Sequence, residues 1–414
     1  MLFFSKFKIQ NVFSILFCIL PLALVSGPFL SDLILSLIGI FFIVISVRNK
    51  LWIYYKNTFV YLFLTFYFLI LLGSIFSSSP VNSLESSLFY FRYLFFTLGV
   101  IYLLDNEPKL SYYFGYVLFA TILLVLMDAY IQYFTGYNLL GYEKWSINRF
   151  SGFLKDEALG RYLAYLMPLL FATLSMKKII YRHELIFAML ILILCDVLVY
   201  LTGERTSFLL LFLGTLIIVF NIKRYKYLRA ICFVVSIAIV FIITNYSPEI
   251  KRRVIDTSIQ GFEIGSEDIK IINKHYDTLY KTSYQIFLDN PIKGIGVKNF
   301  RIVCGEKKYY AEDSCSTHPH NTLLQFLSET GLSGTLFYLG FLLYCSSKLI
   351  IHFINMIFKR NDYMLEDYQV CLYACYIVML WPFAPSLNFF NNWVSVLYFL
   401  PLPFLLMDTK KLYK

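Results

Sequence analysis

Long blocks of apolar residues are the feature that most limits how this chain can fold. Hydrophobic residues make up 59% of its 414 positions and charged residues only 15%, and a bilayer core needs roughly 20 apolar residues per helix. The blocks predict an all-α polytopic membrane protein with about twelve transmembrane helices. No small-residue cleavage site follows the first block, so we expect a retained helix there. The predicted spans are 9–26, 28–47, 58–76, 86–104, 112–134, 158–176, 184–202, 206–222, 228–246, 331–354, 368–387 and 393–408.

Lysine and arginine gather in alternate short connections, whereas the short loops 77–84 and 388–392 carry none. The positive-inside rule therefore predicts a multi-pass protein with both termini cytoplasmic. On this topology, residues 1–246 are a membrane domain with helices 1–9, residues 247–318 are one large periplasmic loop, and residues 319–414 are a membrane domain with helices 10–12. The net charge of +10 mostly reflects this topology, so we expect contact with membrane lipids and no nucleic-acid binding.

Several charged residues fall inside or at the ends of the predicted helices. Burying a charge in hydrocarbon costs about 3 kcal/mol or more and usually marks a pathway or a site. With the predicted topology these residues all lie in the outer half of the membrane, which favours a cavity that opens outward over a carrier with a site near the midplane. The alternative is that they snorkel to the interface or form structural pairs. The residues are Asp32, Glu85, Arg92, Asp128, Arg161, Asp196, Glu204 and Arg205.

The predicted outer loop contains two further signals. Residues 281–288 read as a short amphipathic helix, and the proline and glycines of residues 289–300 stop it. Cys304 and Cys315 are spaced for a disulfide worth about 3 kcal/mol in an oxidising compartment; the alternative is two free thiols. A zinc site formed by these cysteines with His318 and His320 would not match an established spacing of zinc ligands, so we predict no metal.

A histidine pair precedes the tenth predicted span in the sequence Thr317-His318-Pro319-His320-Asn321. Pro319 suits the first turn of a helix that Thr317 or His318 would cap. His320 would then lie at a helix N-terminus, which attracts anions and lowers the pKa of a histidine. A neutral imidazole there suits a general base. A lone loop histidine usually has no role, but the charged outward face favours catalysis here.

Aromatic residues make up 19% of the chain and allow two interpretations. On the predicted outer side, Trp145, Tyr309, Tyr310 and Trp393 are candidates for stacking on sugars. Interfacial belts and helix packing are the commoner use of such residues in membrane proteins, and we favour that interpretation.

The histidine motif resembles a known family. His320-Asn321, nine residues, Gly331, two residues and Gly334 match the signature of O-antigen ligases. The surrounding segments 149–153, 203–207 and 290–300 are also similar to that superfamily, which includes O-antigen polymerases and protein O-oligosaccharyltransferases. The resemblance runs from about residue 149 to residue 350, in the same order.

The resemblance implies a glycosyltransferase of the bacterial inner membrane whose active site faces the periplasm. Such an enzyme takes a glycan from undecaprenyl diphosphate and passes it to a hydroxyl of lipid A-core or another glycan acceptor, without metal or cofactor. His320 would be the catalytic base and Arg205 would hold the carrier diphosphate, because its planar fork binds phosphate oxygens bidentately. The remaining candidates for binding substrate are Arg149, Arg161, Arg301, His318 and Asn321.

One departure and two alternatives remain open. Many relatives carry another arginine where this chain has Tyr276, so Arg253 or Lys281 could take that role. A polymerase would use the same donor and fold, and no local motif excludes it. A purely structural membrane protein would tolerate substitution at His320 and Arg205.

Overall fold

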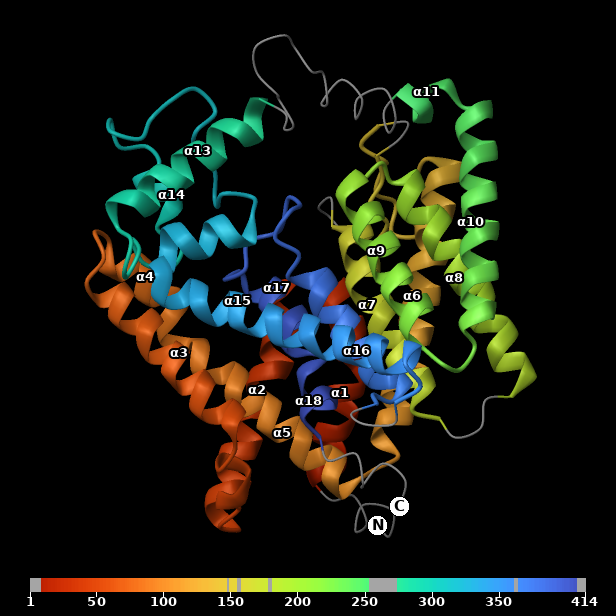
Figure 1. Ribbon diagram of the computed structural model, residues 1–414, viewed down its shortest axis with the longest axis horizontal. Helices are drawn as coiled ribbons and strands as arrows, with labels where there is room; N and C mark the ends of the chain where they lie inside the picture. The colour runs from red at the N-terminus through yellow and green to blue at the C-terminus, as the bar shows by residue number, and fades with distance from the viewer. Residues whose placement is uncertain are drawn as a thin grey trace.

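The computed structural model describes residues 9–146, 149–154, 158–177, 181–252, 274–360 and 364–407. Within these ranges the chain forms helices and no named strand (Figure 1). The elements are α1 (Ile9–Val25), α2 (Pro28–Arg48), η1 (Trp52–Tyr55), α3 (Thr58–Ile75), α4 (Pro80–Ser87), η2 (Leu88–Phe91), α5 (Arg92–Asn106), α6 (Leu110–Thr135), α7 (Leu159–Ser175), α8 (Arg182–Leu201), α9 (Arg205–Asn221), α10 (Lys226–Tyr246), α11 (Pro248–Lys251), α13 (Lys274–Asp289), α14 (Phe300–Val303), α15 (Thr322–Ile357), α16 (Asp367–Met379), α17 (Asn392–Phe399) and α18 (Leu402–Leu406).

Seven helical segments in the described ranges are long and apolar enough to cross a membrane. They are α2, α3, the continuous stretch Pro80–Asn106, α6, α8, α10 and α15. The prediction of an all-α polytopic membrane protein is therefore confirmed. The total of about twelve spans stays a prediction, because the other predicted spans fall on shorter helices such as α1, α7 and α9.

Two predicted spans differ from the structure near the C-terminal end. The span 368–387 is wrong in its last part, because α16 ends at Met379 and a loop follows to Asn391. Pro382 and Pro385 lack the amide that a continuing helix needs, and this ends the helix although the residues are apolar. The span 393–408 is divided into α17 and α18, with Pro401 at the N-cap of the second helix.

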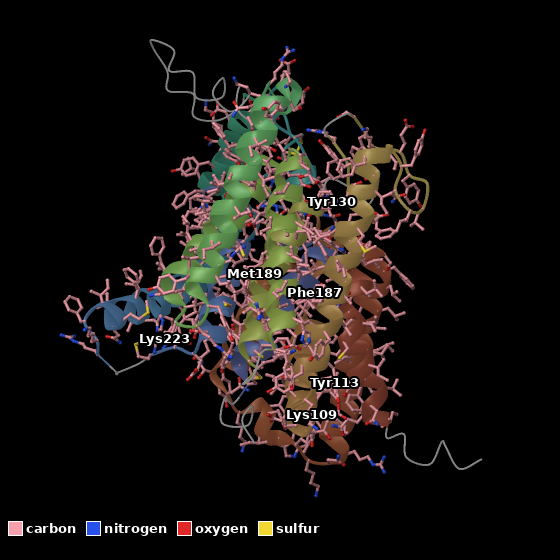
Figure 2. All side chains as sticks on the ribbon, turned by 90° about the vertical axis from the view of Figure 1, so that its right-hand side faces the viewer. Lys109, Tyr113, Tyr130, Phe187, Met189 and Lys223 are labelled. Atoms are coloured by element: carbon pink, nitrogen blue, oxygen red, sulfur yellow. A yellow bond between two sulfur atoms is a disulfide. The ribbon has the colours of Figure 1, made fainter. Side chains whose placement is uncertain are left out.

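The lateral surface is apolar, as a lipid-facing wall requires. Phe187 of α8 and Tyr113 of α6 are more than half exposed. Figure 2 shows them between Tyr130, toward one end of the helices, and Lys109, toward the other. We call the end that carries α13 and the N-terminal end of α15, at the top of Figure 1, the site end.

Helix α7 lies at the centre of a group of packed helices. Nearly all its residues are buried, and it packs against α16, α9 and α6. Tyr165 of α7 donates a hydrogen bond to the carbonyl of Met379 (3.4 Å), and the thiol of Cys375 donates to the carbonyl of Tyr165 (3.3 Å). These contacts fix α7 against α16, so the loop after α16 leaves the core next to the start of α7.

Helix α15 breaks at Gly331, whose φ of 62° and ψ of −164° suit glycine alone. A break leaves backbone groups without helical partners. The turn at residues 290–296, directly after α13, supplies partners on both sides of this break, and we call the joined segments the turn–kink clasp. Its hydrogen bonds are Ile295 N to Ser328 O (3.0 Å), Gly296 N to Glu329 O (2.9 Å), Leu332 N to Pro291 O (2.8 Å) and Ser333 N to Ile292 O (3.2 Å).

Some of the helix charges form structural pairs. Asp196 of α8 accepts hydrogen bonds from Arg229 (3.3 and 3.4 Å) and from the hydroxyl of Ser236 (2.9 Å), and all three residues are buried. Arg92 lies 2.9 Å from Asp32. The alternative of structural pairing therefore describes Asp196 and Asp32, and neither charge is evidence for an outward cavity.

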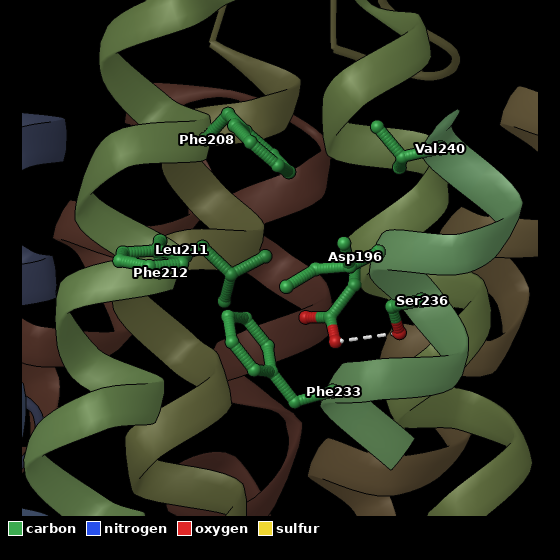
Figure 3. A pocket seen from close by; sticks show the side chains of 8 residues that line it. Asp196, Phe208, Leu211, Phe212, Phe233, Ser236 and Val240 are labelled. Carbon is green, nitrogen blue, oxygen red and sulfur yellow. Dashed lines mark hydrogen bonds between the residues drawn. The ribbon is translucent and has the colours of Figure 1, made fainter. Parts of the chain in front are cut away.

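A small pocket lies beside the Asp196 pair. Figure 3 shows the bond between Asp196 and Ser236 next to the aromatic rings of Phe208, Phe212 and Phe233, which line the pocket. Its other lining residues are aliphatic. None of the predicted site residues lines this pocket, so we assign it to the packing of α8, α9 and α10.

Candidate functional site

The histidine motif and the loop after α16 meet at the site end. The amide of Ser386 donates to the carbonyl of His320 (2.8 Å), and the side-chain amide of Asn321 donates to the carbonyl of Pro382 (2.8 Å). The hydroxyl of Thr322 donates to that of Ser386 (2.8 Å). Residues separated by more than sixty positions are thus tied into one unit, which we call the two-loop site.

The helix after the histidines begins later than the sequence suggested. The N-cap is Asn321, whose side chain accepts a hydrogen bond from the amide of Leu324 (3.0 Å), and α15 begins at Thr322. The prediction that Thr317 or His318 caps a helix with Pro319 in its first turn is wrong, because asparagine is the stronger cap and stands nearer the helix. His320 therefore directly precedes the N-cap.

His320 has a backbone conformation that is uncommon outside glycine. Its φ is 55°, in the left-handed region that only a few per cent of non-glycine residues adopt. Its Nε2 lies 3.1 Å from the hydroxyl of Ser316, and its ring centroid lies 4.1 Å from that of His318. The edge of the site is formed by Tyr276, whose ring centroid is 6.0 Å away. Such strain persists where the surroundings over-determine it, and it clusters at functional sites.

His318 is buried and serves to hold the motif. Its Nε2 lies 3.1 Å from the carbonyl of Ser386, so this nitrogen carries the proton, and its Nδ1 accepts from the hydroxyl of Thr317 (3.1 Å). Burial lowers the pKa of His318 to about 3, and the neighbouring His320 and the charge of Arg301 act in the same direction. The neutral ring thus joins the two loops and does not exchange protons near neutral pH.

Arg161 is the buried cation of the two-loop site. It is the third residue of α7, and its guanidinium donates to the carbonyl of Pro385 (2.9 Å). Its Cζ also lies over the ring of Tyr165, 5.7 Å from the centroid. Since Pro385 directly precedes Ser386, these bonds place a permanent positive charge beside the histidine loop.

Glu204 connects the start of α9 to the start of α7. Its carboxylate accepts hydrogen bonds from the amides of Gly160 (2.8 Å) and Arg161 (3.2 Å) and from the hydroxyl of Ser207 (2.7 Å). Burial raises the pKa of this carboxyl group. A side chain on Gly160 would collide with it, because a Cβ there would lie 2.9 Å from the carboxyl carbon. Glu204 therefore positions the helix end that carries Arg161, a role that the sequence did not reveal.

The other predicted cations lie at separate places around this unit. Arg205 is the exposed first residue of α9, next to Glu204. Arg301 is exposed on α14, and its charge acts on His318. Arg149 is exposed, and its amide donates to the carbonyl of Ser146 (3.1 Å). The hydrogen bonds that define the two-loop site do not involve Arg149. By contrast, Arg205 follows Glu204, which binds the start of α7, and the charge of Arg301 acts on His318.

Lys298 is a further cation that the sequence did not single out. It lies in the segment between the turn–kink clasp and α14, with a φ of 59°. Burial and the charges of Arg301 and Arg92 lower its pKa, while Glu329 and Glu85 oppose them. The glycines and the asparagine of residues 294–299 signalled a turn around it, because such residues tolerate the left-handed conformation.

Cys304 and Cys315 form a disulfide with a Cα–Cα distance of 5.2 Å. The bridge connects α14 to the segment that leads into His318. This bond replaces the predicted alternative of two free thiols, and it leaves neither cysteine available as a thiolate ligand for zinc. Arg253 lies outside the described residues, and Lys281 pairs with Asp277 on α13 (2.7 Å).

These features define an all-helical membrane protein with a polar, histidine-bearing site formed by loops at one end of its helices. Residues 187–339 match the family model described as O-antigen ligase. The match confirms the predicted resemblance to the O-antigen ligase superfamily over these residues. A comparison with curated proteins finds no match.

The matched stretch covers one part of the candidate site. It contains Arg205, Arg301 and His320 together with the turn–kink clasp. Arg149, Arg161 and the loop after α16 lie outside it. The structure thus adds to the matched domain a buried arginine and a loop that hydrogen-bonds to the histidine motif.

Proposed function

We propose that this protein is a membrane glycosyltransferase that passes an O-antigen glycan from undecaprenyl diphosphate to a hydroxyl group of lipid A-core. The observation that carries the proposal is the two-loop site. His320 is held there in a left-handed conformation, next to a loop that the buried Arg161 also binds. A positioned histidine beside fixed positive charge is what a base and an anionic leaving group require.

The reaction is a single inverting displacement that uses no metal ion. His320 takes the proton of the acceptor hydroxyl as its oxygen attacks the anomeric carbon of the glycan. The bond from that carbon to the lipid diphosphate breaks on the opposite face, and the electron pair leaves with the phosphate oxygen. Charge develops on the leaving group, so fixed cations there lower the barrier.

Arg205 is our first candidate for binding the diphosphate, with Arg161, Arg301 and Arg149 as second candidates. The position at which relatives carry another arginine is Tyr276, and its ring lies beside His320. The aligned position is therefore at the site although its charge is absent. Arg301 on α14, whose charge acts on His318, and Lys298 just before this helix are our candidates to supply that charge.

The site end faces the periplasm in this proposal, and both termini face the cytoplasm. The Cys304–Cys315 bond at that end supports this orientation, because disulfides persist in oxidising compartments. Residues 1–246 and 319–414 then form the membrane part with about twelve helices, and residues 247–318 form the periplasmic loop.

The test uses the purified protein in nanodiscs with a polyprenyl-diphosphate oligosaccharide. One reaction receives lipid A-core and a second receives only more donor, beside a His320→Ala variant and an Arg48→Ala control at the exposed last residue of α2. Product on lipid A-core that disappears in the histidine variant supports the proposal. Lengthened carrier-linked glycan would make the protein a polymerase, and glycan on an added acceptor protein would make it a protein O-oligosaccharyltransferase. Activity that survives His320→Ala would refute the assignment of the base.

A further inference from the structure

The loop after α16 presents one aromatic ring at the two-loop site. Phe383 is 80% exposed, although Ala384 next to it is buried and Pro382 before it is also buried. Exposed apolar side chains are expected on the lipid-facing helices of a membrane protein, but Phe383 is in a loop. Its ring forms a T-shaped aromatic pair with Trp381, with a centroid distance of 5.6 Å.

The position of Phe383 is fixed on both sides. The carbonyl of Pro382 accepts from Asn321, and the carbonyl of Pro385 accepts from Arg161. Ser386 then bonds to the carbonyl of His320. The loop therefore cannot move without breaking contacts to His320 itself, to Asn321 and to the buried Arg161.

The polar groups bound by the loop that carries Phe383 indicate which kind of ligand would contact its ring. Figure 1 shows the loop between α16 and α17 rising at the site end between α15 and α9, and its hydrogen bonds reach residues at the starts of α15 and α7. The exposed ring of Phe383 is therefore carried by a loop whose neighbouring residues hydrogen-bond to the guanidinium of Arg161, the side-chain amide of Asn321 and the carbonyl of His320. A lipid chain has nothing to offer these polar groups. A sugar ring has an apolar C–H face for the aromatic ring and hydroxyl groups around its edge for hydrogen bonds.

We propose that Phe383 is a sugar-binding residue, on which one pyranose ring of the transferred glycan or of the acceptor stacks next to His320. This inference rests on the proposed glycosyltransferase function and names the chemical class that its site binds. The stacked ring would orient the reacting sugar, because the loop that carries Phe383 is the same one that fixes the carbonyl of His320.

The test compares Phe383→Ala, Phe383→Leu and Phe383→Trp with the wild type in nanodiscs. Stacking predicts that the alanine and leucine variants raise KM about tenfold for one sugar substrate, with kcat changed less than about threefold, and that tryptophan keeps the wild-type KM. Separate titrations of donor and acceptor show which sugar is stacked. The matched control is Phe29→Ala at the start of α2, where the ring is 78% exposed; its KM values should be unchanged.

Binding measurements separate this inference from the proposed reaction. Polyprenyl diphosphate with and without its glycan, and lipid A-core, are titrated against each variant. A loss of affinity in Phe383→Ala that is confined to sugar-bearing ligands supports stacking even if no transfer is detected. An equal loss for the sugar-free carrier, or a leucine variant that equals the wild type, would overturn it. If the wild type binds both sugars yet transfers nothing, only the proposed reaction fails.

Discussion

Gly294 and Gly331 lie back to back in the turn–kink clasp. A Cβ on Gly331 would lie 2.7 Å from the amide nitrogen of Gly294 and 2.4 Å from the carbonyl oxygen of Ile292. The two glycines allow the turn after α13 to approach the broken helix closely enough for its backbone to take over the lost hydrogen bonds. The break in turn separates the part of α15 that begins at the histidine motif from the longer part that follows.

Gly331→Ala should therefore destabilise the protein strongly. The added methyl group collides with backbone, and the conformation at this residue is one that only glycine adopts readily, so we expect a loss of about 3 kcal/mol or more. Gly340→Ala on the same helix is the control, because no atom lies within 4 Å of its added Cβ and alanine favours a helix by about 1 kcal/mol. Thermal unfolding in detergent measures both. Equal melting temperatures would contradict the clasp.

Stability and activity should separate at His320. The left-handed conformation costs a non-glycine residue roughly 1–2 kcal/mol, so His320→Gly should keep or raise the melting temperature. The same change removes the proposed base, and we expect glycosyl transfer to fall by about a hundredfold or more. Transfer and unfolding are measured on one preparation, with His320→Ala beside it. A glycine variant that unfolds early would mean that the imidazole is needed for folding instead.

Glu204 should affect the reaction through Arg161. In Glu204→Ala the amides of Gly160 and Arg161 lose their acceptor, at a cost of about 1–3 kcal/mol. Because the start of α7 then shifts relative to Pro385, we expect a higher KM for the lipid diphosphate donor. The control is Ser207→Ala, which removes one donor to the carboxylate and leaves both amide bonds in place. An unchanged donor KM in Glu204→Ala would show that Arg161 is positioned by other contacts.

His318 should make stability depend on pH in the acid range. Burial lowers its pKa from 6.5 to about 3 in the folded protein, so between these values the unfolded chain binds more protons. The contribution of the neutral His318 to the free energy of unfolding is then fully present above about pH 6.5. As the pH is lowered from that value, the free energy of unfolding decreases by at most about 1.4 kcal/mol per pH unit. His318→Gln can still donate to Ser386 and does not titrate. Its stability should decline less steeply in melts from about pH 8 to about pH 5; parallel curves would exclude this histidine as the cause.

Local patterns predicted the helices and the histidine motif well for identifiable reasons. Apolar blocks mark α2 or α10 because each carries its own membrane-length pattern, and the His320 to Gly334 spacing lies within one continuous segment. The N-cap was misplaced by a few residues, because Thr317 and Asn321 are both acceptable caps until tertiary contacts select one of them. The hydrogen bond of Asn321 to Pro382 makes that selection.

The loop after α16 escaped prediction for a different physical reason. Residues 380–387 are mostly apolar, so hydropathy extends the preceding span through them, although Pro382 and Pro385 forbid a regular helix. Their function in the site comes from bonds to His320, Asn321 and Arg161, which are distant in sequence. The role of Glu204 escaped prediction for the same reason, since nothing near it in the chain indicates that its carboxylate caps α7.

The Cys304–Cys315 bond should matter more for the reaction than for the melting of the helices. The bridge closes an eleven-residue separation, worth about 3 kcal/mol by loop entropy, and His318 follows three residues after its second cysteine. A Cys304→Ser, Cys315→Ser double variant should lower kcat/KM about tenfold, because the segment before the motif gains freedom, while the main thermal transition moves little. Reductant should have the same effect on the wild type and none on the double variant, since the other six cysteines are free and buried. Full activity in the double variant would show that the two-loop contacts alone position His320.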